Sequence, residues 1–316
     1  MTIQNIHNLA VRKGIEGDFR STQEVDALLA RRKKKFDRLS DADKVEFDQE
    51  SLINPYADSR ILHIAYDKKI TKALVGIDID VAEILMAKSL ADIDLVVAHH
   101  PAGRAFADMH EVMEMQADIF NYYGVPINVA EGLMRERISE VFRGINPRNN
   151  WRVVDAARLL GVNLICWHTV ADNQAAWFVR EAIEAEKPEY VDDVMKVLRG
   201  IGEYQEAMKM GSGPRMYAGR LENRCGKVAV SFTGGTEGSA KLYERMAHAG
   251  IGTIVGMHVT EDHKREAEAA HLNVLIAGHM SSDSIGMNLI CDELEKEGVE
   301  IIPCSGFLRV SRVKKE

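Results

Sequence analysis

Two adjacent histidines, His99 and His100, directly follow a short apolar segment, DLVVA at residues 94–98. This segment is β-branched and apolar on both alternating faces, which predicts a strand buried in a parallel sheet. Ligands bind at the carboxyl ends of such strands, because the loops diverge there and leave a crevice. Pro101 disfavours a helix at His100, so a bend could bring both rings to one site. The alternative is a pair of ordinary loop histidines.

The pattern LIxxHxxxD occurs twice, each time at the end of a strand-like run. The first copy places His168 before Asp172, and the second places His279 before Asp283. In each copy the carboxylate follows about one helical turn after the imidazole, so both groups can point toward the same place. The spacing alone is weak evidence, because His63 also has it at the start of an apolar segment, where a structural role is expected.

The selected side chains supply nitrogen and oxygen donors and no thiolate. Six such donors exceed what one tetrahedral ion takes from a protein, but they suit two ions with open positions for water or substrate. Carboxylates that bridge favour two ions a few ångströms apart. Zinc, manganese, iron, nickel and cobalt all fit this donor set, and three unrelated strand-end histidines are the alternative. The candidate metal ligands are His99, His100, His168, Asp172, His279 and Asp283.

A glycine-containing turn, GGTEGS at residues 234–239, follows the strand-like segment KVAVSF and precedes a helical pattern. Such a turn can offer backbone N–H groups to a phosphate. It matches neither the dinucleotide-binding fingerprint nor the P-loop, so a simple tight turn is the alternative.

Short apolar runs alternate with helical patterns from Ile61 onward, which predicts an α/β fold. A polar, glycine-rich break at residues 211–226 suggests a domain boundary near residue 220. The chain is expected to contain a helical N-terminal extension at 1–58, a first α/β domain with a helical insert at 59–220, and a second α/β domain at 221–316.

Composition bounds the function class. The 316 residues are 46% hydrophobic and 28% charged, as in ordinary globular proteins. Neither an apolar run of about eighteen residues nor a signal pattern is present, so we expect a cytoplasmic protein without membrane contact. The four cysteines form no CxxC pair and are expected to be reduced. The net charge of −8 disfavours nucleic-acid binding, and the basic run at residues 31–35 is expected to be a solvated helix face.

At these motifs the sequence resembles the Nif-three family, also described as GTP cyclohydrolase-like dinuclear metal proteins. ALVGIDID at residues 73–80 and DLVVAHHP at 94–101 are similar to the family's opening strand and double-histidine motif. WHTVAD at 167–172 is similar to its HTNLD motif, and LIAGHMSSD at 275–283 to its GHYATE motif. The resemblance extends from about Lys72 to Phe307.

The resemblance implies that the six candidate residues hold the metal ions. It also implies two α/β domains that face one another across the metal site, and a homo-oligomer that is often a ring-shaped hexamer. Two departures are evident. The family's last ligand is usually glutamate, and the shorter Asp283 predicts a more distant or water-mediated contact with an ion. The segment NQAAWFVRE at 173–181 replaces a glycine-rich continuation, which changes the expected substrate contacts.

The first functional hypothesis is therefore a metal-dependent hydrolase of a nucleotide or another small heterocyclic molecule. Two ions would lower the pKa of bound water so that hydroxide forms near neutral pH. His258, His263 or Glu261 could transfer a proton, although no geometry selects among them. The second hypothesis is a non-catalytic metal-binding scaffold or interaction protein. An open coordination position would favour the enzyme.

Overall fold

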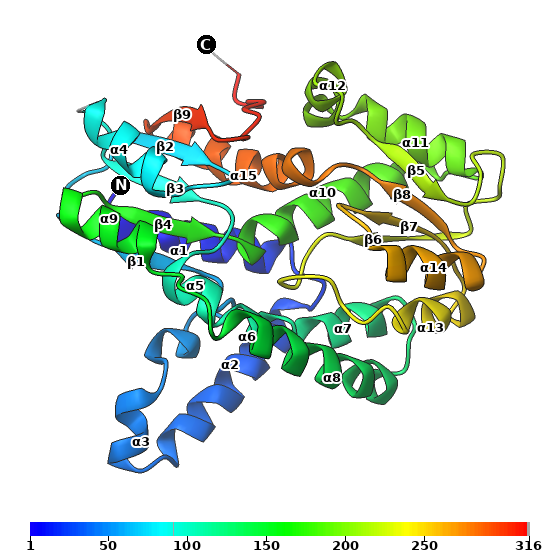
Figure 1. Ribbon diagram of the computed structural model, residues 1–316, viewed down its shortest axis with the longest axis horizontal. Helices are drawn as coiled ribbons and strands as arrows, with labels where there is room; N and C mark the ends of the chain where they lie inside the picture. Colours follow the sequence, from blue (N-terminus) through cyan, green and yellow to red (C-terminus); the bar gives the residue numbers. More distant parts are fainter. Residues whose placement is uncertain (91, 315–316) are drawn as a thin grey trace.

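The computed structural model describes residues 1–90 and 92–314. In this part of the chain two β-sheets lie at opposite ends of two long helices (Figure 1). The first sheet has the strand order β1-β4-β3-β2-β9, and the second has the order β5-β8-β7-β6. The strands are β1 Ser59–His63, β2 Lys72–Gly76, β3 Leu95–Ala98, β4 Leu164–Trp167, β5 Arg215–Ala218, β6 Lys227–Ser231, β7 Ile251–Gly256, β8 Asn273–Ile276 and β9 Glu300–Cys304.

Each sheet has parallel central strands and one antiparallel edge strand. β3 pairs in parallel with β2 and β4, and β7 pairs in parallel with β6 and β8. β1 and β5 run antiparallel to β4 and β8. Every residue of β3, β4 and β8 is buried, which confirms the predicted strands and explains their continuous apolar character. The α/β class expected from the sequence is thereby confirmed.

The helices connect the strands and cover the faces of both sheets. Between β3 and β4 the chain is helical, as the sequence predicts for the insert. The helices are α1 Ile3–Glu16, α2 Thr22–Asp37, α3 Asp41–Glu46, the short 3-10 helix η1 Gln49–Leu52, α4 Val81–Ser89, α5 Gly103–Ala107, α6 Met109–Val112, α7 Met115–Tyr122, α8 Ile127–Ile145, α9 Arg152–Leu160, α10 Thr169–Glu186, α11 Val191–Gly200, α12 Gly202–Lys209, α13 Leu242–His248, α14 Glu261–Ala269 and α15 His279–Lys296.

Helices α10 and α15 join the two sheets. α10 leaves the end of β4 and runs toward the second sheet, whereas α15 leaves the end of β8 and returns toward β9 in the first (Figure 1). The first turn of α10 is buried, and α15 is buried from Ser281 to Asn288, so that both Asp172 and Asp283 are shielded from solvent. The carboxyl ends of β4 and β8 therefore lead into one shared region between the sheets.

The N-terminal segment has two different parts. α1 belongs to the core of the first sheet, because Ile6 and Ala10 are fully buried in a cluster that includes Val170 of α10. By contrast, α2 and α3 extend away from the body of the molecule (Figure 1, blue). The basic run at 31–35 lies on α2 and is exposed apart from the half-buried Arg32, which fits the expected solvated face.

The predicted boundary near residue 220 does not coincide with the division between the sheets. β5 precedes this residue yet pairs with β8, and β9 follows it yet pairs with β2. The helical insert also crosses the division, since Met134 of α8 packs in one cluster with Ile254 of β7. No helix in the described part of the chain combines the length and apolarity that spanning a membrane requires.

Candidate metal centre

All six predicted ligands lie together between the two sheets. We call this group of six side chains the metal cluster, or simply the cluster. His99 and His100 follow β3 directly, and His168 caps the start of α10 after β4. His279 opens α15 after β8. Asp172 and Asp283 lie one turn into α10 and α15, four residues after their histidines. The shared position at the ends of buried strands thus brings three distant segments to one place.

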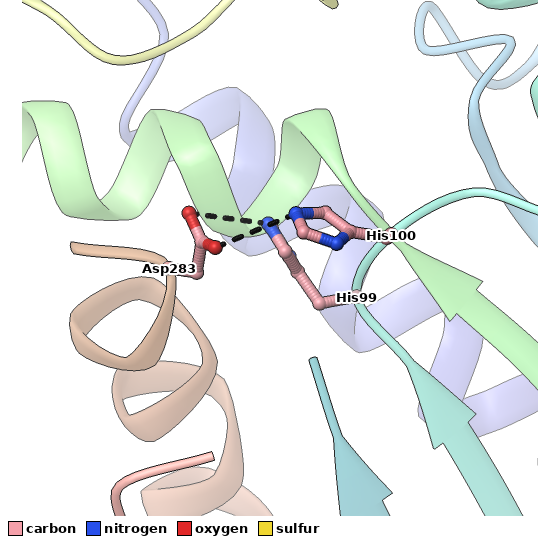
Figure 2. A group of neighbouring side chains, drawn as sticks. All are labelled: His99, His100 and Asp283. Carbon is pink, nitrogen blue, oxygen red and sulfur yellow. Dashed lines mark ion pairs between the residues drawn. The ribbon is translucent and has the colours of Figure 1, made fainter. Parts of the chain in front are cut away.

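The closest approaches centre on His99. Its Nε2 lies 3.5 Å from Oδ1 of Asp172 and 3.5 Å from Oδ1 of Asp283. The Nε2 of His100 lies 3.6 Å from Oδ2 of Asp283. Figure 2 shows His99, His100 and Asp283 directed toward one another. Five of the six residues form two overlapping groups whose donor atoms are close enough to hold an ion, namely His99, His100 and Asp283, and His99, His168 and Asp172.

His279 lies at the rim of the cluster. Its Nε2 is 3.8 Å from Oδ2 of Asp283, and its ring centroid is 5.1 Å from that of His100. Its side chain is 44% exposed, whereas that of Asp283 is 1% exposed. His279 belongs to neither of the two compact groups, so the structure places it beside the cluster on the side that solvent reaches.

The Nδ1 atoms of three histidines are held by oxygen acceptors. His99 Nδ1 lies 2.9 Å from the carbonyl oxygen of Trp167, and His168 Nδ1 lies 2.7 Å from Oδ2 of Asp58. His100 Nδ1 lies 2.6 Å from Oδ1 of Asp78. Because a carbonyl or carboxylate oxygen can only accept, each Nδ1 carries the proton and donates. Each Nε2 is then left as the nitrogen that can bind a metal ion, which is how protein metal sites orient their histidines.

Several buried atoms of the cluster have no hydrogen-bond partner in the described part of the chain. These atoms are His99 Nε2, Asp172 Oδ1 and both carboxylate oxygens of Asp283. A buried polar atom without a partner loses its solvation without compensation, and the loss is larger for a charged group. Divalent ions would satisfy all of these atoms at once. The donor set therefore fits metal ions.

The electrostatics of the cluster point the same way. Burial opposes a charged imidazole, but Asp172 and Asp58 outweigh it and raise the pKa of His168 to about 9. Burial raises the pKa of Asp172 to about 6 and lowers the pKa of His279 to about 4. Burial also acts to raise the pKa of Asp283, but the neighbouring histidines outweigh it and lower that pKa. Without metal, the buried carboxylates therefore retain protons or protonated neighbours, which a cation can replace.

A cavity of about 90 Å³ adjoins the cluster. His168, Asp172, His279 and Asp283 form one wall, and residues of the second sheet, its loops and helices, and α7 form the rest. Of the three predicted proton-transfer residues, His258 and His263 line this cavity, whereas Glu261 is exposed and does not. The Nδ1 of His258 lies 2.8 Å from Oε1 of Glu237, a carboxylate that also lines the cavity.

Sequence reasoning missed the two carboxylates that orient the histidines. Asp78 follows the end of β2, so the strand-end rule applied to β3 could have found it. Asp58 precedes β1. Because β1 is antiparallel to β4, its beginning rather than its end lies at the metal cluster, and no local pattern reveals this.

Comparison with known proteins supports the family resemblance at the level of the fold. No family model and no curated protein matches the sequence. The structure is similar to a NIF3 superfamily protein from Sphaerobacter thermophilus, with a TM-score of 0.70 and 26% identity over 79% of this chain and 91% of that one. It is also similar to reduced HcgD from Methanocaldococcus jannaschii, with a TM-score of 0.50 and 17% identity over 84% of this chain and 97% of that one. The chain therefore has the fold of the NIF3 superfamily.

Proposed function

We propose that the cluster binds two divalent metal ions and that the protein is a metal-dependent hydrolase of a small heterocyclic substrate such as a nucleotide. One observation carries the metal-binding part. Three histidines have Nδ1 fixed by oxygen acceptors, so that each Nε2 is free to bind beside two buried carboxylates. The substrate class rests on the resemblance of the three motifs to the Nif-three family.

The donor set limits the metal. Cys166 is the nearest thiol in sequence to the cluster, but its Sγ lies 3.3 Å from the carbonyl oxygens of both Asp58 and His99, and burial raises its pKa well above the usual range. It is therefore a protonated thiol rather than a ligand. Imidazole and carboxylate donors suit zinc, manganese, iron, nickel and cobalt.

The arrangement favours catalysis over a closed structural site. Bound ions would supply a metal-activated water at neutral pH. His99, His100, His168, Asp172, His279 and Asp283 would hold the ions. The adjoining cavity leaves space for water and part of a substrate, and His279 opens toward solvent. Access of this kind distinguishes catalytic metal sites from structural ones, whose ligands are all protein atoms.

The first test is elemental analysis of the purified protein after reconstitution with zinc, manganese or iron. We expect about two equivalents in the wild type, in keeping with a paired-ion site, and a loss in both His99→Ala and His279→Ala. His63→Ala is the matched control, because this histidine has the same HxxxD spacing but lies in β1 outside the cluster. Unchanged metal content in both cluster variants would refute the site.

Turnover needs a separate assay. Metal-loaded wild type is incubated with a panel of nucleotides, and product formation is followed by chromatography, with Asp172→Ala as the negative control. Product that depends on both the metal and Asp172 would support the hydrolase. Full metal occupancy without product from any substrate would favour the non-catalytic metal-binding protein.

A further inference from the structure

The connection between β6 and α13 contains residues 233–239, TGGTEGS, which we call the glycine loop. Most of this loop lines the cavity that His168, Asp172, His279 and Asp283 also line. Figure 1 shows the connection in yellow, reaching from the second sheet toward α7, α8 and α10. Oγ1 of Thr233 donates to Oδ1 of Asn173, the residue that follows Asp172 on α10, over 2.6 Å. The loop is thus attached to the helix that carries the metal cluster.

Side chains from three other elements hold the carbonyl groups of the glycine loop. Nε2 of Gln116 donates to the carbonyl oxygens of Gly234 and Thr236, both over 2.6 Å. Nε of Arg137 donates to the carbonyl oxygen of Glu237 over 3.0 Å. The third donor is Nε2 of His263, which lies 3.1 Å from the carbonyl oxygen of Gly238. Four carbonyl groups of one short loop are therefore already satisfied by the protein.

The N–H groups of the same loop are in the opposite situation. From Thr233 to Ser239, no backbone N–H donates a hydrogen bond to any atom of the described part of the chain. Most N–H groups that are shielded from water in folded proteins have a partner, because leaving such a hydrogen bond unmade is costly. A loop in which most carbonyl groups accept hydrogen bonds from the protein while the N–H groups have no partner is suited to bind an anion.

The backbone conformation supports this assignment. Gly234 and Gly235 have φ values of +99° and +87°, which L side chains rarely adopt. A Cβ at Gly234 would also collide with the side chain of Gln116, so glycine permits the approach of the residue that holds two loop carbonyls. Successive N–H groups around such residues form concave anion sites in many proteins.

The charges around the cavity include one carboxylate on the loop itself. Oε1 of Glu237 lies 2.8 Å from Nδ1 of His258, and this partner helps to lower the pKa of Glu237 against the opposing effect of burial. The Glu237 carboxylate is therefore paired with His258. The metal cluster on the opposite wall would add positive charge once its ions are bound.

We propose that the glycine loop binds a phosphate group of the substrate, so that the substrate is a phosphorylated compound whose reacting part lies at the metal cluster. This inference deepens the proposed function and rests on it for the identity of the bound molecule as substrate. The binding of phosphate by the loop can be tested independently of metal content and turnover.

The sequence offers a selective probe of this site. Gly234-Gly235 is the single Gly-Gly pair in the chain. Protein labelled with ¹³C-carbonyl glycine and ¹⁵N glycine gives one signal in a carbonyl-filtered amide spectrum, that of the Gly235 N–H. Inorganic phosphate is titrated into zinc-loaded and zinc-free protein, with chloride and acetate at equal ionic strength as comparisons. We expect a saturable shift with phosphate, stronger with zinc bound and still present without it.

Variants establish which contacts are responsible. Gln116→Ala removes the donor to two loop carbonyls, and Arg137→Ala removes the donor to a third. We expect each variant to weaken phosphate binding about five- to tenfold, because each loses hydrogen bonds that order the loop, and this factor is typical of one hydrogen bond. Gln205→Ala is the matched control, because this glutamine donates to the carbonyl oxygen of Gly200 on the exposed surface. It should bind phosphate as the wild type does.

The failures of the two proposals are distinguishable. If the protein binds no metal but Gly235 still responds to phosphate, the loop assignment stands and the metal assignment fails. The loop assignment is overturned if Gly235 does not respond in either state, or if it responds equally to acetate or chloride. It is also overturned if it responds only in the zinc-loaded state with an affinity that Gln116→Ala and Arg137→Ala leave unchanged, since phosphate would then bind the metal alone.

Discussion

Gly286 of α15 packs directly against the backbone carbonyl of Ala171 of α10. A Cβ on residue 286 would overlap the carbonyl oxygen, so only glycine allows this approach. Ala171 precedes Asp172, and Gly286 lies three residues after Asp283. This close approach of the two helices is therefore next to the two carboxylates of the metal cluster. We infer that it sets their separation.

Gly286→Ala should push α10 and α15 apart. We expect a loss of about 1–3 kcal/mol in the free energy of unfolding, which is the usual effect of overpacking a core, together with weaker metal binding. Urea unfolding and zinc titration measure the two effects. Gly132→Ala is the control, because Gly132 lies on α8 with open space where its Cβ would be. That change should be neutral or stabilising by up to about 1 kcal/mol. Unaltered zinc affinity in a destabilised Gly286→Ala would show that the contact does not set the site.

The hydrogen bond from His168 Nδ1 to Asp58 should tune metal affinity. The side chain of Asp58 is fully buried and also accepts from Oγ1 of Thr169 over 2.7 Å. Asp58→Asn removes the negative charge behind the histidine, and loss of such outer contacts typically weakens metal binding about 10–100-fold. Chelator competition with zinc measures the change.

Asp78→Asn is the matched comparison, because Asp78 holds His100 in the same way but its side chain is 70% exposed. Water can replace an exposed partner, so we expect a smaller decrease than for Asp58→Asn. Equal decreases in the two variants would show that burial of the orienting carboxylate is unimportant.

Metal binding should stabilise the fold through the cluster. An ion that binds only the folded state at a free concentration 100 times its Kd raises the free energy of unfolding by about 2.7 kcal/mol. Calorimetry of wild type with and without zinc should show a corresponding rise in Tm. Asp172→Ala should unfold cooperatively, bind less metal and gain little from zinc. A zinc-dependent gain equal to that of the wild type would mean that the stabilising ion binds elsewhere.

The sequence predicts which histidines and aspartates come together, because the signals for their positions are local. β3, β4 and β8 are short, apolar and buried, and each is followed by a histidine at its carboxyl end. The HxxxD spacing then places Asp172 and Asp283 on the same side of a helix as their histidines. Strand burial and helical periodicity suffice for these positions.

The remaining features depend on contacts between distant segments. The antiparallel pairing of β1 with β4 brings Asp58 to His168 across 110 residues. The return of β9 to β2 and the packing of α8 against the second sheet make a single boundary near residue 220 inconsistent with the sheets. Such pairings depend on the tertiary structure and leave no periodic signal in one sequence.

Asp94 is a carboxylate of the first sheet that does not belong to the metal cluster, and its charge is expected to stabilise the fold. Its Oδ2 accepts from the N–H and Oγ1 of Thr71, over 2.8 and 2.7 Å, and its Oδ1 lies 2.9 Å from Nζ of Lys68. Burial acts to raise the pKa of Asp94, but these hydrogen bonds outweigh it and lower the pKa below its usual 3.8. The ionised side chain therefore joins the starts of β2 and β3.

Asp94→Asn should lower the free energy of unfolding by about 2 kcal/mol at pH 7, the typical value for hydrogen bonds to a charged group. Because the folded pKa lies below the unfolded one, this contribution is fully present above about pH 4 and is lost as the pH falls through the folded pKa. The difference in free energy of unfolding between wild type and Asp94→Asn, measured by urea unfolding, should be constant from pH 8 to 5 and become smaller below pH 4. Asp92→Asn, at an exposed carboxylate that contacts Lys72, should have a smaller effect at pH 7. A difference in free energy of unfolding that increases on acidification would contradict the lowered pKa of Asp94.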